Sequence, residues 1–243
     1  MPSILINEEA GVRYLQFGAH WIQGAMRIRR PWALELEYTR DMMFPLLLRP
    51  RSAWPRSVLL IGLGAGSLTK FAYRHMKRAR LEVVEIEPQV VMTAWQFFGL
   101  PPESSRLRIE IADGYQHVAA TARRYDLILV DGFDARVHAG DLDSTVFYRH
   151  CRARLTRDGM LATNLVSRRG APRASLERIA RVFDGRVLAL PPNEANTIAL
   201  AAIGDPIQMG GATLRASARA LKRATGLDLL PTLSRRDGAG LAL

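Results

Sequence analysis

The stretch that decides the fold is SVLLIGLGAGS, residues 57–67. Its apolar run at 58–61 has the length and composition of a buried strand. Three glycines, Gly62, Gly64 and Gly66, follow directly, and glycine lets a backbone turn tightly while a ligand approaches without meeting a β-carbon. In a parallel sheet such a loop lies at the carboxyl end of its strand, where ligands bind. We therefore expect these three glycines to bind a nucleotide-like molecule.

The spacing of the glycines separates two classes of ligand. A dinucleotide-binding loop has its third glycine or alanine one position later, where this chain has Ser67. The G-x-G-x-G spacing instead resembles the loop of enzymes that bind S-adenosylmethionine. A glycine turn that only packs a strand against a helix is the alternative interpretation.

Outward from this loop, apolar runs of strand length alternate with helical segments. Strands are expected at 57–62, 81–87, 107–112, 125–131, 160–166, 186–190 and 197–203, and helices at 67–76, 88–98, 114–122, 144–155 and 211–227. This alternation favours an α/β fold with a doubly wound parallel sheet and helices on both faces. The last two strands have no helix between them and are expected to pair in an antiparallel manner at the sheet edge.

The first part of the chain has a different hydrophobic pattern. Short polar–apolar alternations punctuated by Gly11 and Gly18 predict two or three antiparallel strands. WALELEYTRDMMFPLLL, residues 32–48, then has helical spacing. We divide the chain into an N-terminal β-strand region, 1–32, and a Rossmann-like nucleoside-binding domain, 33–243.

Acidic residues follow two of the strands at the rim where the glycine loop lies. Glu85 and Glu87 lie at the end of the second strand and are expected to point to the same side, where a carboxylate accepts hydrogen bonds from both ribose hydroxyls. Asp113 and Gly114 follow the third strand. Asp113 either accepts a hydrogen bond from an adenine amine or caps the next helix, and both roles are compatible.

The fourth strand ends in VDGFDA, which brings Asp131 and Asp134 to the same rim. Transfer of a group to an amine needs a base that accepts a proton and negative charge that holds a cation, and paired acids suit both tasks. We take Asp131 and Asp134 as candidate catalytic residues. Acids that only cap the following turn are the alternative.

Composition limits the partners. The net charge of +11 indicates either an anionic partner, such as nucleic acid, or a solvated basic surface, and we favour the surface because the arginine clusters lack interleaved aromatics. The single cysteine, Cys151, allows no intrachain disulfide. No apolar run reaches the length of a membrane span and no signal-peptide pattern opens the chain, so we expect a cytoplasmic protein without a membrane partner. The five histidines show no metal-ligand spacing, and no metal is expected; they are His20, His75, His117, His138 and His150.

Together these motifs resemble the spermidine synthase family, the polyamine aminopropyltransferases. The similarity runs from about residue 12 to residue 203 and includes the glycine loop, VEIE at 84–87, ADG at 112–114, VDGFDA at 130–135, FYRHCRARLTRDGML at 147–161 and GAHWIQGAM at 18–26. The resemblance implies a class I methyltransferase-type sheet preceded by β-hairpins that bring Gln23 to the site. It further implies that Glu85 holds the ribose and Asp113 the adenine, that Asp131 is the base near the attacking amine, and that Asp134 helps to bind the substrates.

The resemblance also implies an activity. Family members transfer an aminopropyl group from decarboxylated S-adenosylmethionine to an amine in polyamine biosynthesis and release methylthioadenosine. The donor is a co-substrate, so no tightly bound cofactor is expected. The partners implied are a small-molecule amine and a second copy of the chain, as in a dimer.

Departures from the family pattern keep other functions open. Ala65 stands where the family has an aspartate for the donor amine, and Thr39 and Arg40 stand where a tyrosine and a histidine are expected. Arg40 and the missing aspartate suit intact S-adenosylmethionine, which keeps its carboxylate. A methyltransferase on the same fold is therefore the second hypothesis, and a non-catalytic basic binding protein the third. Asp41 and Glu194 are candidates to replace the lost negative charge.

Overall fold

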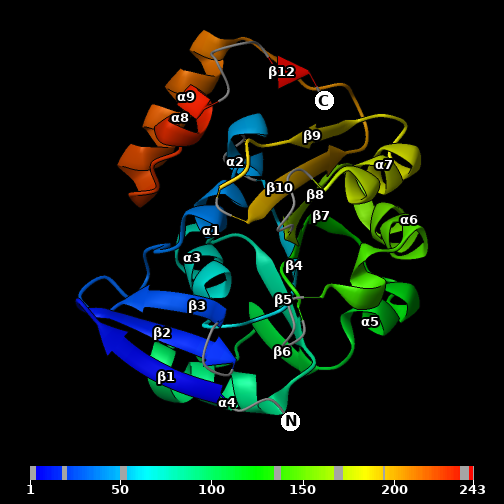
Figure 1. The fold of residues 1–243 in the computed structure, drawn as a ribbon. Helices are drawn as coiled ribbons and strands as arrows, with labels where there is room; N and C mark the ends of the chain where they lie inside the picture. Colours follow the sequence, from blue (N-terminus) through cyan, green and yellow to red (C-terminus); the bar gives the residue numbers. More distant parts are fainter. Residues whose placement is uncertain are drawn as a thin grey trace.

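A seven-stranded sheet forms the centre of the protein (Figure 1). The structure is a computed structural model that describes residues 4–17, 21–49, 54–133, 138–166, 172–193, 195–235 and 241–242. The strands lie in the order β6-β5-β4-β7-β8-β10-β9. Their bounds are β4 (Ser57–Ile61), β5 (Arg80–Glu85), β6 (Leu107–Ile111), β7 (Tyr125–Val130), β8 (Leu155–Val166), β9 (Val187–Ala189) and β10 (Asn196–Ala202).

The strand order reverses between β4 and β7. The chain first builds outward from β4 to β5 and β6, then returns so that β7 pairs with the other side of β4. These pairings and that of β7 with β8 are parallel, whereas β10 pairs antiparallel with both β8 and β9. The doubly wound sheet and the antiparallel pair at its edge are both confirmed. The reversal opens a crevice at the carboxyl ends of β4 and β7.

Helices cover both faces of the sheet because the strands are apolar on both sides. Along β7, Leu127 and Leu129 face one buried cluster, and Ile128 and Val130 face the other. The first cluster includes residues of α2 (Pro45–Leu48), α3 (Ser67–His75), α4 (Pro88–Phe98) and α8 (Gly211–Thr225), and the second those of α5 (Gly114–Ala120), α6 (Thr145–Ala153) and α7 (Arg173–Val182).

The helix expected at 32–48 forms only in part. The structure has two short helices there, α1 (Glu37–Asp41) and α2, because Pro45 cannot continue a helix and instead occupies the first turn of a new one. Helices α7 and α9 (Leu230–Arg235) were not among the expected elements. Short elements complete the chain: a 3₁₀ turn, η1 (Gly140–Asp143), and the paired strands β11 (Gln208–Met209) and β12 (Leu241–Ala242). No helix among the described residues is long and apolar enough to cross a membrane.

The N-terminal strands form a separate antiparallel sheet, drawn in blue in Figure 1. It consists of β1 (Ile4–Glu9), β2 (Val12–Phe17) and β3 (Trp21–Arg27). This sheet docks on the glycine loop, where Gly24 lies so close to Ala65 that a β-carbon at position 24 would be 2.5 Å from that of Ala65. Ser67 adds a hydrogen bond from its Oγ to the carbonyl of Ala25, 3.1 Å long. The division into two domains at residue 32 stays a prediction.

The contact between Gly24 and Ala65 can be tested by filling it. We expect Gly24→Val to lower the free energy of unfolding by about 1–3 kcal/mol, because the added side chain forces the N-terminal sheet away from the loop. Gly210→Ala is the control, since a β-carbon there meets no atom within 4 Å, and it should cost less than about 1 kcal/mol. Urea unfolding of the three proteins measures both effects, and equal stabilities would show that the two segments are not tightly docked.

Candidate active site

A cavity of about 540 Å³ opens at the carboxyl ends of the central strands. Most of the residues expected at the rim line it: Gly62, Gly64, Glu85, Asp113, Gly114, Asp131 and Gln23. Gly66 does not line it; this glycine is the N-cap of α3, with a φ of +68°, and a β-carbon there would lie 2.9 Å from Leu100. Asp134 lies outside the described residues.

Gly62 joins the glycine loop to the end of β7. Its amide donates to the carbonyl of Val84, and the amide of Asp131 donates to the carbonyl of Ile61. Where β4 and β7 end, a β-carbon on Gly62 would lie 2.1 Å from the carbonyl oxygen of Asp131, and the φ of Gly62 is +89°. Both the close approach and the left-handed backbone require glycine.

Gln23 reaches the cavity through an irregularity in β3. Leu15 pairs with Gly24 and Gln16 with Ile22, which leaves Gln23 as the extra residue of a β-bulge. A bulge re-aims its residue out of the ladder. Gln23 lines the cavity, and its backbone carbonyl oxygen would lie 2.8 Å from a β-carbon on Gly64. The N-terminal sheet therefore brings Gln23 to the cavity, and the role that the family resemblance implies for it stays a prediction.

Glu85 ends β5 beneath the glycine loop. Only 8% of the residue is exposed, and its carboxylate accepts hydrogen bonds from the amides of Leu63 (2.8 Å) and Glu87 (2.9 Å). Burial raises its pKa, and these hydrogen bonds oppose the rise. Each carboxylate oxygen has a second lone pair for a ribose hydroxyl. The expectation that Glu87 points the same way is wrong: the strand stops at Glu85, and Glu87 caps α4 by accepting from the amide of Gln89.

Asp113 caps α5 and lines the cavity at the same time. Its Oδ1 accepts from the amide of Gln116 at 2.9 Å, which confirms the capping role. Gly114 begins the helix, and a β-carbon there would lie 2.4 Å from Cγ2 of Ile61. Glycine thus lets the start of α5 pack closely on β4, which keeps Asp113 next to the glycine loop.

Asp131 is held by two neutral hydrogen-bond donors. Its Oδ1 accepts from Nδ2 of Asn164 at 3.0 Å and its Oδ2 from the hydroxyl of Tyr38 at 3.2 Å. Burial raises the pKa of the carboxyl, and the two hydrogen bonds oppose that rise. Burial and the charge of Asp131 also raise the pKa of Tyr38, so the phenol remains a donor. All three residues line the cavity. The site therefore holds a basic carboxylate with a fixed orientation.

Sequence reasoning missed both partners of Asp131. Asn164 is a polar residue inside the apolar run MLATNLV, and a buried polar residue near a strand end is a usable signal. Tyr38 directly precedes TRDM, the segment in which family resemblance expects the tyrosine at position 39. Thr39 itself is buried and donates to the carbonyl of Leu36.

Arg40 and Asp41 are not where the sequence analysis expects them to act. Arg40 lines a separate cavity of about 700 Å³ and donates to the carbonyls of Leu34 and Glu35, so it adds no positive charge beside Asp131. Asp41 is buried against α9, where it accepts from Thr232 at 2.5 Å and Arg235 at 2.6 Å. It is therefore not available to replace a lost charge in the site.

Ala65 does not line the cavity either. Its side chain belongs to a small buried cluster with Leu15, Met26 and Phe98 under the N-terminal sheet. Glu194, the other candidate for a compensating acid, lies outside the described residues. Neither Ala65 nor Asp41 therefore supplies the negative charge that the family's aspartate would bring to the donor amine.

The raised pKa of Asp131 has a consequence for stability. A carboxyl whose pKa is higher in the folded than in the unfolded protein contributes its full stability below its ordinary pKa, and that stability is lost as the pH rises through the folded value. Asn164→Leu removes a donor to the carboxylate and raises this pKa further. We expect the variant to lose about 1.5–3 kcal/mol more at pH 8 than at pH 4, measured by urea unfolding. This dependence on pH should disappear in the double variant that also carries Asp131→Asn. If it persists there, a group other than Asp131 causes it.

Comparison with known proteins agrees with this architecture. Residues 35–168 match the model of the spermine/spermidine synthase domain. The polyamine aminopropyltransferase of Neisseria meningitidis serogroup A is 35% identical over 228 residues, which are 93% of this chain and 86% of that protein. Human methyltransferase-like protein 13, solved in complex with SAH, has a TM-score of 0.69 at 26% identity over 79% of this chain and 93% of that chain. A spermidine synthase solved with the transition-state analogue AdoDATO has the same fold, with a TM-score of 0.63 at 21% identity over 83% of this chain and 74% of that chain. A family model that covers more than half of the chain and a relative aligned along most of it lead to one conclusion: the protein belongs to the spermine/spermidine synthase family.

Proposed function

We propose that this protein is an aminopropyltransferase that acts on a small polyamine-type amine with decarboxylated S-adenosylmethionine as its donor. The observation that carries the proposal is the partly buried Asp131 carboxylate, held by Tyr38 and Asn164 in the cavity that Glu85 and the glycine loop also line. Relatives that are 35% identical to this chain over 93% of its length bear the name polyamine aminopropyltransferase.

The donor half of the site is assigned by position. Glu85 would accept the ribose hydroxyls, Asp113 the adenine amine, and Gln23 would contact the donor from the N-terminal sheet. Gly62 and Gly64 would let the donor lie against the loop, because neither carries a β-carbon. The cavity volume of about 540 Å³ falls within the range of small-molecule sites.

The reaction needs the acceptor amine in its neutral form. Its lone pair attacks the methylene carbon next to the sulfonium, the carbon–sulfur bond breaks, and the electron pair goes to sulfur as methylthioadenosine leaves. The proton that the nitrogen gives up passes to Asp131. A carboxyl whose pKa is raised by burial is a better proton acceptor than an exposed one, which suits a general base. Asp134 would add negative charge for the cationic acceptor.

A methyltransferase is the second candidate. Ala65 favours it, because the family aspartate for the donor amine is missing, and human methyltransferase-like protein 13 shares the fold with SAH bound. Arg40 does not favour an intact donor, because it lines a different cavity. The Asp131 carboxylate in the cavity and relatives named as aminopropyltransferases favour the first candidate.

Side-by-side calorimetry of the two donors separates these candidates. We expect decarboxylated S-adenosylmethionine to bind at least about tenfold more tightly than the intact form, because an extra carboxylate in the cavity that Asp131 and Glu85 line is repelled. Tighter binding of the intact donor would contradict the proposal and favour methyl transfer.

Substitution of Asp131 tests the chemical role. We expect Asp131→Asn to lower the rate of transfer to an amine by about 10²–10⁴-fold, because the general base is lost while the shape is kept. The dissociation constant of the donor should change little. Asp205→Asn, which removes an exposed acid beyond the other end of β10, is the control for net charge. A collapse of donor binding in Asp131→Asn would mean that Asp131 holds the donor instead.

The remaining assignments are proposals of the same kind. We place the enzyme in the cytoplasm and assign it no tightly bound cofactor. We further propose a homodimer in which β1 contributes to the contact. Leu5 and Ile6 on this edge strand are 45% and 36% exposed, and an edge strand with exposed apolar residues is a ready pairing surface.

A further inference from the structure

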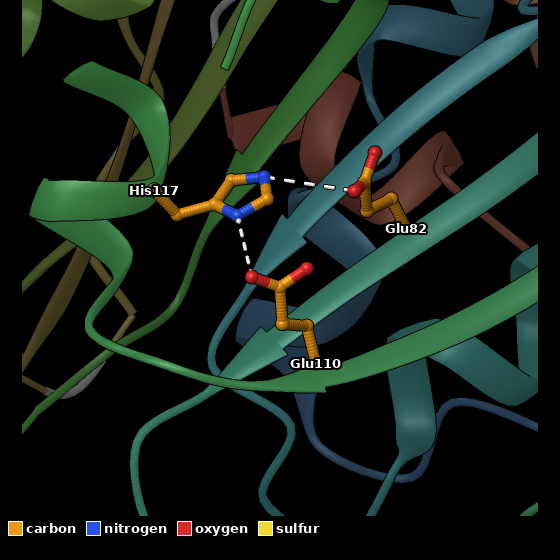
Figure 2. Close-up of side chains that lie close together, drawn as sticks. All are labelled: Glu82, Glu110 and His117. Atoms are coloured by element: carbon orange, nitrogen blue, oxygen red, sulfur yellow. Dashed lines mark ion pairs between the residues drawn. The ribbon is translucent and has the colours of Figure 1, made fainter. Parts of the chain in front are cut away.

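Two glutamates and a histidine meet on the face of the sheet that α5 covers (Figure 2). Glu82 comes from β5, Glu110 from β6 and His117 from α5. One oxygen or nitrogen atom from each lies within 4.8 Å of the corresponding atoms of the other two. The side chains of Glu82 and His117 are only 7% and 8% exposed. The sequence gives no hint of this cluster, because its members are far apart along the chain.

The imidazole of His117 lies between two carboxylates, and a neutral ring can donate a hydrogen bond to only one of them. Nε2 is 3.7 Å from Oε1 of Glu82, and Nδ1 is 3.5 Å from Oε1 of Glu110. Nε2 is buried and has no hydrogen-bond partner among the described residues. A neutral imidazole carries one N–H and one lone pair, so one nitrogen would face a carboxylate with no proton between them. A cation is needed there, either a proton or a metal ion.

The distances favour a metal ion. A charged N–H···O⁻ hydrogen bond spans about 2.7–2.9 Å. Two ligand atoms bound to one tetrahedral zinc ion, each about 2.0–2.2 Å from it, lie about 3.4 Å apart. Both nitrogen–oxygen separations are too long for the first value, and the 3.7 Å between Nε2 and Oε1 of Glu82 is close to the second. Because one ion binds only one imidazole nitrogen, an ion at Nε2 and Glu82 requires Glu110, which lies at Nδ1, to turn toward it.

The surrounding side chains orient both carboxylates toward the ring. Oε2 of Glu82 accepts from the hydroxyl of Tyr125 at 2.8 Å and from Nη1 of Arg123 at 2.9 Å. Oε2 of Glu110 pairs with Arg108 at 3.0 Å. Oε1 of each glutamate therefore faces His117, and such outer partners are what hold metal-binding carboxylates in place. Glu110 is one-third exposed, so it can turn toward an ion.

We propose that Glu82, Glu110 and His117 bind one divalent transition-metal ion of the Zn²⁺ type. One imidazole nitrogen and one oxygen from each glutamate are the ligands, and water completes the coordination. Nitrogen and carboxylate donors in this combination suit zinc and its neighbours better than Mg²⁺. The ion would fix α5 to β5 and β6, and α5 begins at the rim of the donor cavity. The proposal is independent of the proposed reaction.

Calorimetric titration of the full chain with ZnCl₂, after removal of metals with a chelator, tests this proposal. We expect one ion per chain, and binding at least about tenfold weaker in His117→Gln and in Glu110→Gln. His75→Gln is the matched control, because His75 is another partly buried helical histidine outside this cluster, and it should bind as the wild type does. Glu110 is partly exposed, so its variant remains informative if His117→Gln fails to fold.

Cobalt absorption and NMR complete the test. We expect Co²⁺ to give visible d–d bands in the wild-type protein that disappear in His117→Gln. Zinc binding of equal strength in wild type and both variants would overturn the proposal, as would no binding to the wild type. A doubly protonated His117 at neutral pH in ¹⁵N NMR spectra, together with no zinc binding, would identify the cation as a proton.

Discussion

The approach of Gly62 to the backbone of Asp131 is the constraint on which the site depends. With a β-carbon at position 62 only 2.1 Å from the carbonyl of Asp131, no other residue fits where β4 and β7 diverge. This close approach fixes the glycine loop relative to the segment that follows β7. Glu85 then binds the loop from below through the amide of Leu63, and Gln23 lies against it from the N-terminal sheet. The residues that we propose bind the two substrates therefore lie together because two parallel strands separate at a glycine.

The contact between Gly24 and Ala65 gives the family departure in the loop a structural explanation. The side chain at position 65 points into the cluster of Leu15, Met26 and Phe98, beneath the N-terminal sheet. An aspartate in this conformation would be a buried carboxylate without a partner, which is strongly unfavourable. Alanine at 65 and glycine at 24 thus belong to one packing solution. Ala65 therefore reflects how the N-terminal sheet packs on the glycine loop. It is weak evidence about whether the co-substrate keeps its carboxylate.

Local patterns were enough to predict the sheet, because strand length, glycine loops and helical spacing are properties of neighbouring residues. They were also enough to place Glu85, Asp113 and Asp131 at one rim, since parallel strands end on the same side. They failed where tertiary contacts decide. Tyr38 reaches Asp131 across 93 residues of sequence, and α7 was hidden in a polar, arginine-rich segment. Arg40 was misassigned because it lies two residues after Tyr38 on α1, and such residues face different sides of a helix, so Tyr38 lines the site cavity and Arg40 the other one.

The partners of Asp131 matter more for chemistry than its burial alone. Other acids in this basic chain are paired with arginine: Asp184 with Arg152 and Asp143 with Arg178. The pKa of Asp184 is lowered chiefly by its hydrogen bond from Arg152, and a carboxylate stabilised in this way is a poor proton acceptor. Asp131 receives its two hydrogen bonds from a phenol and an amide, which orient it without adding positive charge. In a protein with a net charge of +11, burial raises the pKa of Asp131, and in the described structure no cation among its hydrogen-bond donors cancels that rise.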